Sequence, residues 1–238
     1  NVDAGALHKC DAVTGTNKSD QRRWSKVWFG FPHVGAGHKD EHRNVLANQL
    51  LILRFLISVA PYLTEGPLPE AIQGRKRRAA SEDDEDDEEP IEAADDEPDV
   101  SATSVPPRRQ GSVLITIRNV VPYTLWNIPM LGKRLRDVLQ PIAASAPSPP
   151  KGIRAPTVSD VDKNGAQYVL WRSFEFVPSN WPGYSHRRTV GFVEGLSTSH
   201  NEDLLRRPTQ PPQQGQPSGR HVGTGECRTY ELALQPVH

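Results

Sequence analysis

Residues Trp28 to Gly35 read WFGFPHVG, an aromatic-rich run that stops at a proline and continues into a histidine and a glycine. The residues from Lys26 to Phe31 show the near-continuous apolar pattern of a buried parallel strand. Because proline has no backbone N–H for a sheet ladder, the strand must turn at Pro32 and leave His33 at its carboxyl end. Ligands bind at that edge in open α/β sheets. The stretch therefore predicts a parallel sheet and the place of a site.

Strands and helices are expected to alternate around this stretch. A dense run of leucine and isoleucine predicts a helix from about His42 to Ala60, which Pro61 ends. The other expected elements are a strand end at 2–4, a strand at 113–117, a helix from Thr124 to about Leu135, and strands at 168–177 and 228–234. This order indicates an α/β fold with a mainly parallel, three-layer sheet.

The formal net charge of −1 conceals a strong asymmetry. Residues 79–100 hold 13 of the 29 acidic residues and no lysine or arginine, which leaves 28 basic and 16 acidic residues elsewhere, a formal charge of +12. A basic body of this kind suits a polyanionic partner. A cluster of charged residues is more often just a solvated surface. The charge alone is therefore compatible both with such a surface and with a nucleic-acid partner.

Two inserts interrupt what we expect to be a single domain over residues 1–238. Residues 67–110 combine the basic cluster RKRR (Arg75 to Arg78), the acidic tract and many prolines, and residues 197–225 are rich in proline, glutamine and glycine. Neither insert holds enough apolar residues to offset its ordering entropy, so both are predicted to be disordered surface loops. The RKRR cluster is either a nuclear localisation signal or a nonspecific basic patch.

The cysteine spacing and the composition of the apolar helix argue against a metal-binding protein and against a membrane protein. Cys10 and Cys227 are far apart and show no metal-ligand spacing, so no metal site is expected and a reducing compartment is indicated. Residues 45–63 imitate a short membrane span, but Asn48, Gln49 and Arg54 interrupt it, which favours a helix packed on a sheet. The chain has no signal peptide at its start and begins with asparagine, which suggests a piece of a longer protein.

A set of short motifs follows the strand-end turn in a fixed order. The set runs through VDA at 2–4, LH at 7–8, FPHVG at 31–35, NQLL at 48–51, YTLWN at 123–127, PGYSHRRT at 182–189 and RTYEL at 228–232. The combination resembles the family of 25S ribosomal RNA (uridine-N3)-methyltransferases, whose domain is Rossmann-like and depends on S-adenosylmethionine. The resemblance implies a three-layer fold that is incomplete at its amino terminus, because no glycine-rich cofactor turn precedes Asp3.

The resemblance implies that the FPH turn is the floor of a base pocket. Phe31 would stack on the uracil, Pro32 would fix the turn, and His33 would accept or relay the N3 proton. The alternative is that His33 only hydrogen-bonds the turn. The family usually begins this turn with asparagine, and Gly30 stands there in this chain. Backbone groups or another side chain would then replace the missing amide.

The same resemblance assigns residues to the cofactor and to RNA. S-adenosylmethionine would lie against Asp3, Ala4, Phe29 and Gly30. The expected RNA contacts are the aromatic residues Tyr123, Trp126 and Tyr184 and the basic residues His186, Arg187 and Arg188. A surface aspartate, core aromatics and an ordinary Pro-Gly turn are the alternatives.

The resulting hypothesis is an S-adenosylmethionine-dependent methyltransferase that acts on a uridine N3 of large-subunit ribosomal RNA. Its expected partners are ribosomal RNA and the pre-ribosome, with no membrane and no metal, and its expected location is the nucleus and nucleolus. A non-catalytic RNA-binding module with the same fold is the first alternative, and an acidic scaffold for ribosome assembly is the second. If the glycine-rich loop lies upstream of Asn1, the chain alone should not methylate RNA.

Overall fold

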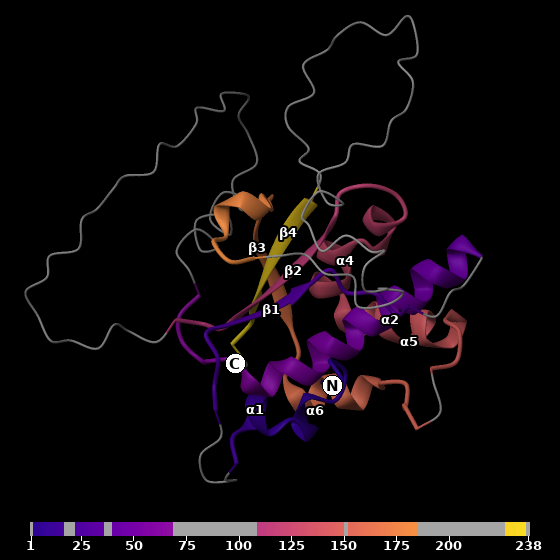
Figure 1. Cartoon of the computed structure of the whole chain (residues 1–238). Helices are drawn as coiled ribbons and strands as arrows, with labels where there is room; N and C mark the ends of the chain where they lie inside the picture. Colours follow the sequence, from indigo (N-terminus) through magenta and orange to yellow (C-terminus); the bar gives the residue numbers. More distant parts are fainter. Residues whose placement is uncertain are drawn as a thin grey trace, which may run out of the picture.

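The computed structural model describes residues 2–16, 22–35, 40–68, 109–149, 152–184 and 227–236 (Figure 1). Most of the predicted insert at 67–110 and all of the insert at 197–225 lie outside these ranges. The described residues form one α/β unit, with a four-stranded sheet and helices packed on it. The α/β class expected from the sequence is confirmed.

The sheet is mixed, and the expectation of a mainly parallel sheet is wrong. Its strands are β1 (Lys26–Gly30), β2 (Ser112–Arg118), β3 (Tyr168–Glu175) and β4 (Cys227–Leu234), in the order β1-β2-β4-β3. Strand β1 is parallel to β2, whereas β4 is antiparallel to both of its neighbours. The positions of all four strands were predicted. The apolar pattern of β1 predicted its parallel pairing with β2, but the pattern of β4 did not reveal that this strand runs the other way.

Helix α2 (Glu41–Val59) is the central element behind the sheet. The side chain of Asp40 caps it by accepting a hydrogen bond from the backbone N–H of Arg43. The Phe55 ring packs on Phe29 of β1, with centroids 4.5 Å apart. With the 3-10 turn η2 (Ala60–Tyr62), this helix is long and apolar enough to cross a membrane. Most of its apolar residues are instead buried in the core, as expected of a helix packed on a sheet.

The remaining helices differ from the expected pattern after β2. The cis bond before Pro122 leads into η3 (Tyr123–Trp126), and α4 (Ile128–Lys133) and α5 (Leu135–Ser145) follow. Thr124 is not the cap that the sequence suggested. Asn127 takes that role, because its left-handed backbone (φ 49°) ends η3 and its side chain accepts a bond from the N–H of Met130.

The other described elements are short. They are η1 (Leu7–Lys9), α1 (Asp11–Thr14), α6 (Val158–Asn164) and η4 (Pro178–Asn180), and residues 2–4 form no strand. Helices α2, α4, α5 and α6 pack against one another and lie together on one side of the sheet (Figure 1). The described residues therefore show two of the three expected layers.

Strand direction brings three strand ends to one edge of the molecule. Because β1, β2 and β3 all run opposite to β4, their carboxyl ends and the start of β4 at Cys227 lie together. This edge, called the carboxyl edge below, carries the FPH turn. The register also divides the sheet into a helix face, with Phe29 and Ile115, and an outer face, with Lys26, Trp28 and Glu231.

Candidate active site

The FPH turn lies at the carboxyl edge, where the sequence placed it. The backbone N–H of Phe31 donates to the Thr116 carbonyl of β2 at 2.8 Å, which is the last bond of the ladder. Phe31 then adopts φ +51°, a left-handed conformation that is strained for a bulky residue. The strand stops here and the chain leaves the sheet at Pro32. Strain of this kind persists only where the surroundings hold it.

Two adjacent polar residues of α2 hold the turns at this edge. The side-chain oxygen of Asn48 accepts the backbone N–H of Val34 at 2.9 Å, which fixes the FPH turn. The side-chain amide of Gln49 donates to the carbonyls of Leu125 and Trp126 at 3.3 and 3.4 Å, which fixes the turn after β2. From the sequence, Asn48 and Gln49 were recognised as interruptions of an apolar run and as part of the NQLL motif, without an anchoring role. Buried amides need partners, and that need was the signal for an anchoring role.

Asn48 is itself held within α2. Its amide nitrogen donates to the backbone and side-chain oxygens of Asn44 at 2.8 and 2.9 Å, and the residue is 1% exposed. Because these donor bonds fix the amide's orientation, its oxygen must face the turn.

A hydrogen bond within the turn fixes the tautomer of the neutral His33 ring. Its Nδ1 accepts the backbone N–H of Gly35 at 2.9 Å, so this nitrogen carries no proton. The remaining proton of a neutral imidazole therefore sits on Nε2, which is a donor. Burial lowers the pKa of His33 below its ordinary value and keeps the ring neutral near pH 7. The imidazole lies 6.2 Å from the ring of Trp126, centroid to centroid.

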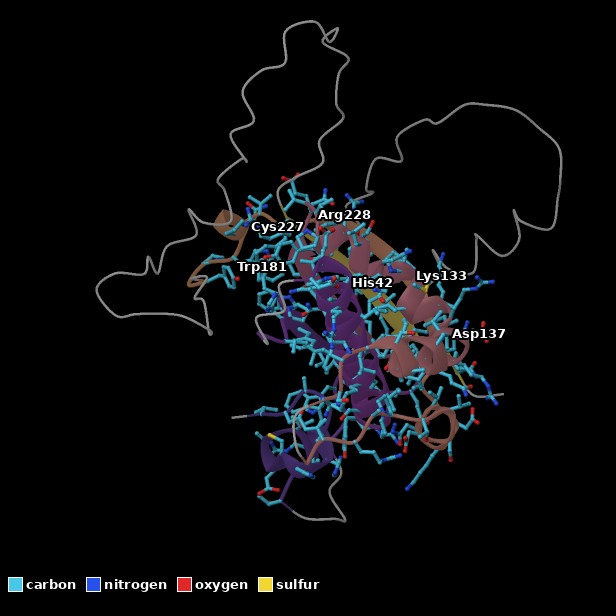
Figure 2. The ribbon with its side chains drawn as sticks, turned by 90° about the vertical axis from the view of Figure 1, so that its right-hand side faces the viewer. His42, Lys133, Asp137, Trp181, Cys227 and Arg228 are labelled. Atoms are coloured by element: carbon cyan, nitrogen blue, oxygen red, sulfur yellow. The ribbon has the colours of Figure 1, made fainter. Side chains whose placement is uncertain are left out.

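Five aromatic side chains gather on the other side of the turn. This aromatic cluster consists of Trp28, Phe31, Phe176, Trp181 and Tyr184. Phe176 is 3% exposed and contacts the other four rings at centroid distances of 5.3 to 5.9 Å. Figure 2 labels Trp181 and Cys227 near each other at one end of the molecule. Phe31 thus belongs to this cluster, and His33 faces Trp126.

Gly30 makes room for one of these rings. A Cβ at position 30 would stand 3.2 Å from Cζ2 of Trp28, closer than ordinary contact. The indole cannot easily yield, because its Nε1 donates to Oγ1 of Thr116 at 2.8 Å. Gly30, which stands where the resemblance implies asparagine, is therefore paired with an indole that lies over the strand end.

Tyr184 closes the cluster beside the first residue of β4. Burial, with a smaller contribution from nearby Cys227, raises the pKa of the Tyr184 hydroxyl to about 12. The phenol is therefore neutral near pH 7.

The four residues expected to bind S-adenosylmethionine do not lie together. Ala4 and Phe29 line a cavity of about 390 Å³ beside β1, whose other walls include Val27 and Phe55. Asp3 is instead paired with Arg54 at 3.3 Å and lines a separate cavity of about 500 Å³ with Arg154 and Lys163. Asp3 and Ala4 were expected to share one site because residues 2–4 were predicted to end a strand. The structure contains no strand there.

The expected RNA contacts are also divided. Trp126 is fully buried, so its ring packs in the core beside Tyr123, at a centroid distance of 5.2 Å. Tyr184 lies in the aromatic cluster. His186, Arg187 and Arg188 fall outside the described residues. Within the described ranges, no three histidine, cysteine or acidic side chains are grouped so that they could hold a metal ion.

Comparison with known proteins gives two matches. The family model described as rRNA (uridine-N3-)-methyltransferase, BMT5-like, matches residues 1–188. The 25S rRNA (uridine(2634)-N(3))-methyltransferase of Saccharomyces cerevisiae is 25% identical over 178 residues, which are 73% of this chain and 40% of the relative. The chain thus spans well under half the length of this curated relative. No solved structure matches.

Proposed function

We propose, since the chain belongs to the BMT5-like family of rRNA (uridine-N3-)-methyltransferases, that the protein methylates N3 of a uridine in large-subunit ribosomal RNA. The observation that carries the proposal is the family's FPH turn at the carboxyl edge of the sheet, held by Asn48 and followed by a neutral histidine. The parallel β1–α2–β2 unit supports a Rossmann-like domain, in which ligands bind at this edge.

The chemistry requires the uracil N3 to lose its proton before it can attack a methyl group. The negative charge that forms spreads onto the two carbonyl oxygens of the base. A donor placed at one of these oxygens stabilises the charge where it develops. In our proposal Nε2–H of His33 is that donor, because the bond from Gly35 to Nδ1 puts the proton on Nε2.

This assignment changes the role expected from the sequence. Nε2 cannot accept the N3 proton while it holds its own, and protonating Nδ1 would break the bond from Gly35. We therefore propose that His33 positions and polarises the base, and that the proton leaves to another acceptor. Pro32 would fix the turn under the base, as the family resemblance implies, whereas the Phe31 ring packs on Phe176 in the aromatic cluster and is assigned no stacking on this base.

S-adenosylmethionine is the methyl donor that we propose, and it supplies an electrophilic methyl group when bound. The cavity beside β1 fits part of it. Most of its walls, among them Ala4, Val27 and Phe29, are apolar and suit a flat adenine ring, and Lys26 and Trp28 also line it. Asp3 is bonded to Arg54 and lines the other cavity, so we assign it no contact with the donor.

The partner in this proposal is ribosomal RNA within the pre-ribosome, and the location is the nucleolus. The formal charge of +12 outside residues 79–100 supports a polyanionic partner. Arg187 and Arg188 remain predicted phosphate contacts. The non-catalytic module, the alternative from the sequence, would bind the same RNA and leave it unmodified.

Mass spectrometry of nucleosides tests the proposal. Large-subunit rRNA is purified from the source organism with and without the gene, and N3-methyluridine is measured against unmodified uridine. Loss of one N3-methyluridine per rRNA after deletion supports the enzyme. An unchanged level, together with RNA binding by the purified protein, would leave the non-catalytic module.

A further inference from the structure

We propose that the aromatic cluster is a stacking platform for an unpaired base of single-stranded RNA, with Trp28 and Trp181 as its open rings and Lys26 and Arg172 as flanking phosphate contacts. The inference rests on the proposed function for the identity of the partner. It adds a binding surface built around Phe31 and Phe176, distinct from the contact of His33 with Trp126.

The first support is the exposure of the two indoles. Trp28 is 44% and Trp181 45% exposed, although each belongs to a cluster with a buried centre at Phe176. Their rings lie nearly parallel, at an interplanar angle of 20° and a centroid distance of 6.1 Å. Large exposed aromatic surface is costly in water and commonly marks a binding site. Stacking on flat aromatic rings is the usual means of holding unpaired RNA bases.

The second support is that the platform is already ordered. Trp28 Nε1 donates to Thr116 Oγ1, and that hydroxyl lies 2.8 Å from Oγ1 of Thr229 on the next strand. Phe176 packs against both indoles from within the cluster. Stacking of a base would therefore cost little conformational entropy of the rings, and this favours binding.

The third support is positive charge on the same face of the sheet. Lys26 lies two residues before Trp28 on β1, about 7 Å along the strand. Lys26 and Arg172 share one carboxylate, that of Glu231, and their side chains are 50% and 53% exposed. Two cations on a single acid leave a net positive charge there. Arg172 also lies over the Trp171 ring, 5.0 Å from its centroid.

This combination favours RNA over a protein partner. The buried centres of protein interfaces are depleted of charge, whereas here half-exposed cations stand on the face that carries Trp28. Rings flanked by cations match a chain of bases joined by phosphates. A second copy of this protein is the competing occupant, and the experiment separates the two.

The test measures binding of short single-stranded RNA by fluorescence anisotropy, without cofactor, at several salt concentrations. The probes are a uridine-containing oligomer and the same oligomer with its central nucleotides made abasic. The test variant is Trp181→Ala. Trp24→Ala is the matched control, because Trp24 is a 38% exposed indole outside the cluster, with its Nε1 bonded to the Val13 carbonyl.

We expect Trp181→Ala to weaken binding of the uridine oligomer about 5- to 100-fold, with an unchanged salt slope because no charge is removed. Trp181→Phe should recover most of the affinity. The abasic oligomer should bind Trp181→Ala and the unaltered protein equally, and Trp24→Ala should behave as the unaltered protein on both oligomers.

Two results would overturn the platform. One is an equal affinity of Trp181→Ala and the unaltered protein for the uridine oligomer. The other is a dimer in sedimentation that Trp181→Ala dissociates while RNA affinity stays the same, which would assign the surface to a second copy. Failure of the methylation proposal is a separate outcome, since it is read from rRNA nucleosides and not from oligomer affinity.

Discussion

At the scale of single residues, the candidate site depends on the side chains of Asn48 and Gln49, which hydrogen-bond the backbone of the turns at the carboxyl edge. The sequence correctly located the FPH turn, because proline cannot continue a sheet ladder. It did not reveal the anchors, because Asn48 and Gln49 sit in an apolar run and their partners lie far away in the chain. The strand end expected at Asp3 is wrong for a different reason. A short motif suggested a strand end, and the contact with Arg54 decided its position.

Asn48→Ala should release the FPH turn. The change leaves the backbone N–H of Val34 without its acceptor, which costs about 1–3 kcal/mol of unfolding free energy. Chemical denaturation measures the loss, and hydrogen exchange should show faster exchange at the Val34 amide. Asn44→Ala is the control, because it removes one side-chain partner of Asn48 and leaves Val34 bonded. If both variants protect Val34 equally, Asn48 is not the anchor.

His33 should titrate below 6.5. Burial disfavours its charged form, so its pKa in the folded state is lower than the ordinary value. The unfolded chain then binds the proton more readily, and stability falls as the pH drops from about 6.5 through the lowered pKa. Above pH 6.5 the ring is neutral in both states, so the folded state has its full stability with respect to this histidine. NMR titration of the imidazole gives the midpoint, and a value at or above 6.5 would refute a lowered pKa for this ring.

Gly30→Asn, which restores the family's usual residue, should destabilise this chain by about 1–3 kcal/mol. The new Cβ would crowd the indole of Trp28, which its bond to Thr116 holds in place. In Trp28→Leu the same change should cost much less, because the crowded ring is gone. A double-mutant cycle in thermal unfolding measures this coupling. Additive effects would show that Gly30 and Trp28 are independent.

At the scale of elements, one ion cluster joins the whole sheet. Glu231 of β4 is 0% exposed and accepts bonds from Lys26 of β1, Ser112 of β2 and Arg172 of β3. Each of the four strands thus supplies one member. The sequence predicted these strands from their apolar residues, but it gave neither the direction of β4 nor this cluster. Both depend on which strands become neighbours.

Glu231→Gln should lower the unfolding free energy by about 1–3 kcal/mol at pH 7. The expected loss is modest because Lys26 and Arg172 are half exposed and water can solvate them once the carboxylate is gone. Burial alone would raise the pKa of Glu231, but the bonds from Ser112, Lys26 and Arg172 outweigh it and lower that pKa below 4.5. The carboxylate therefore stabilises the fold above about pH 4.5.

This stabilisation is lost as the pH falls from 4.5 through the lowered pKa. The unaltered protein and Glu231→Gln should accordingly converge in stability in acid. Urea unfolding of both proteins at pH 7 and at successively lower pH tests the prediction. A constant difference between them at every pH would mean that the charge of Glu231 does not contribute.

At the scale of the whole molecule, family membership and the described fold point to the same edge of the sheet. The family motifs at 31–35, 48–51 and 123–127 are far apart in the sequence, and hydrogen bonds from α2 connect all three. A set of short motifs was therefore enough to predict the family and the location of the turn. The geometry of His33 was not predictable, since it depends on a bond to Gly35 that only the folded loop provides.

The most direct test of the account is complementation of the gene deletion with variants of His33. N3-methyluridine in large-subunit rRNA is measured by mass spectrometry at matched protein levels. We predict that the unaltered gene restores the nucleoside, that His33→Ala restores little of it, and that His33→Asn, whose side-chain amide supplies a donor, restores more than His33→Ala. Full restoration by His33→Ala would contradict a role for this histidine at the base.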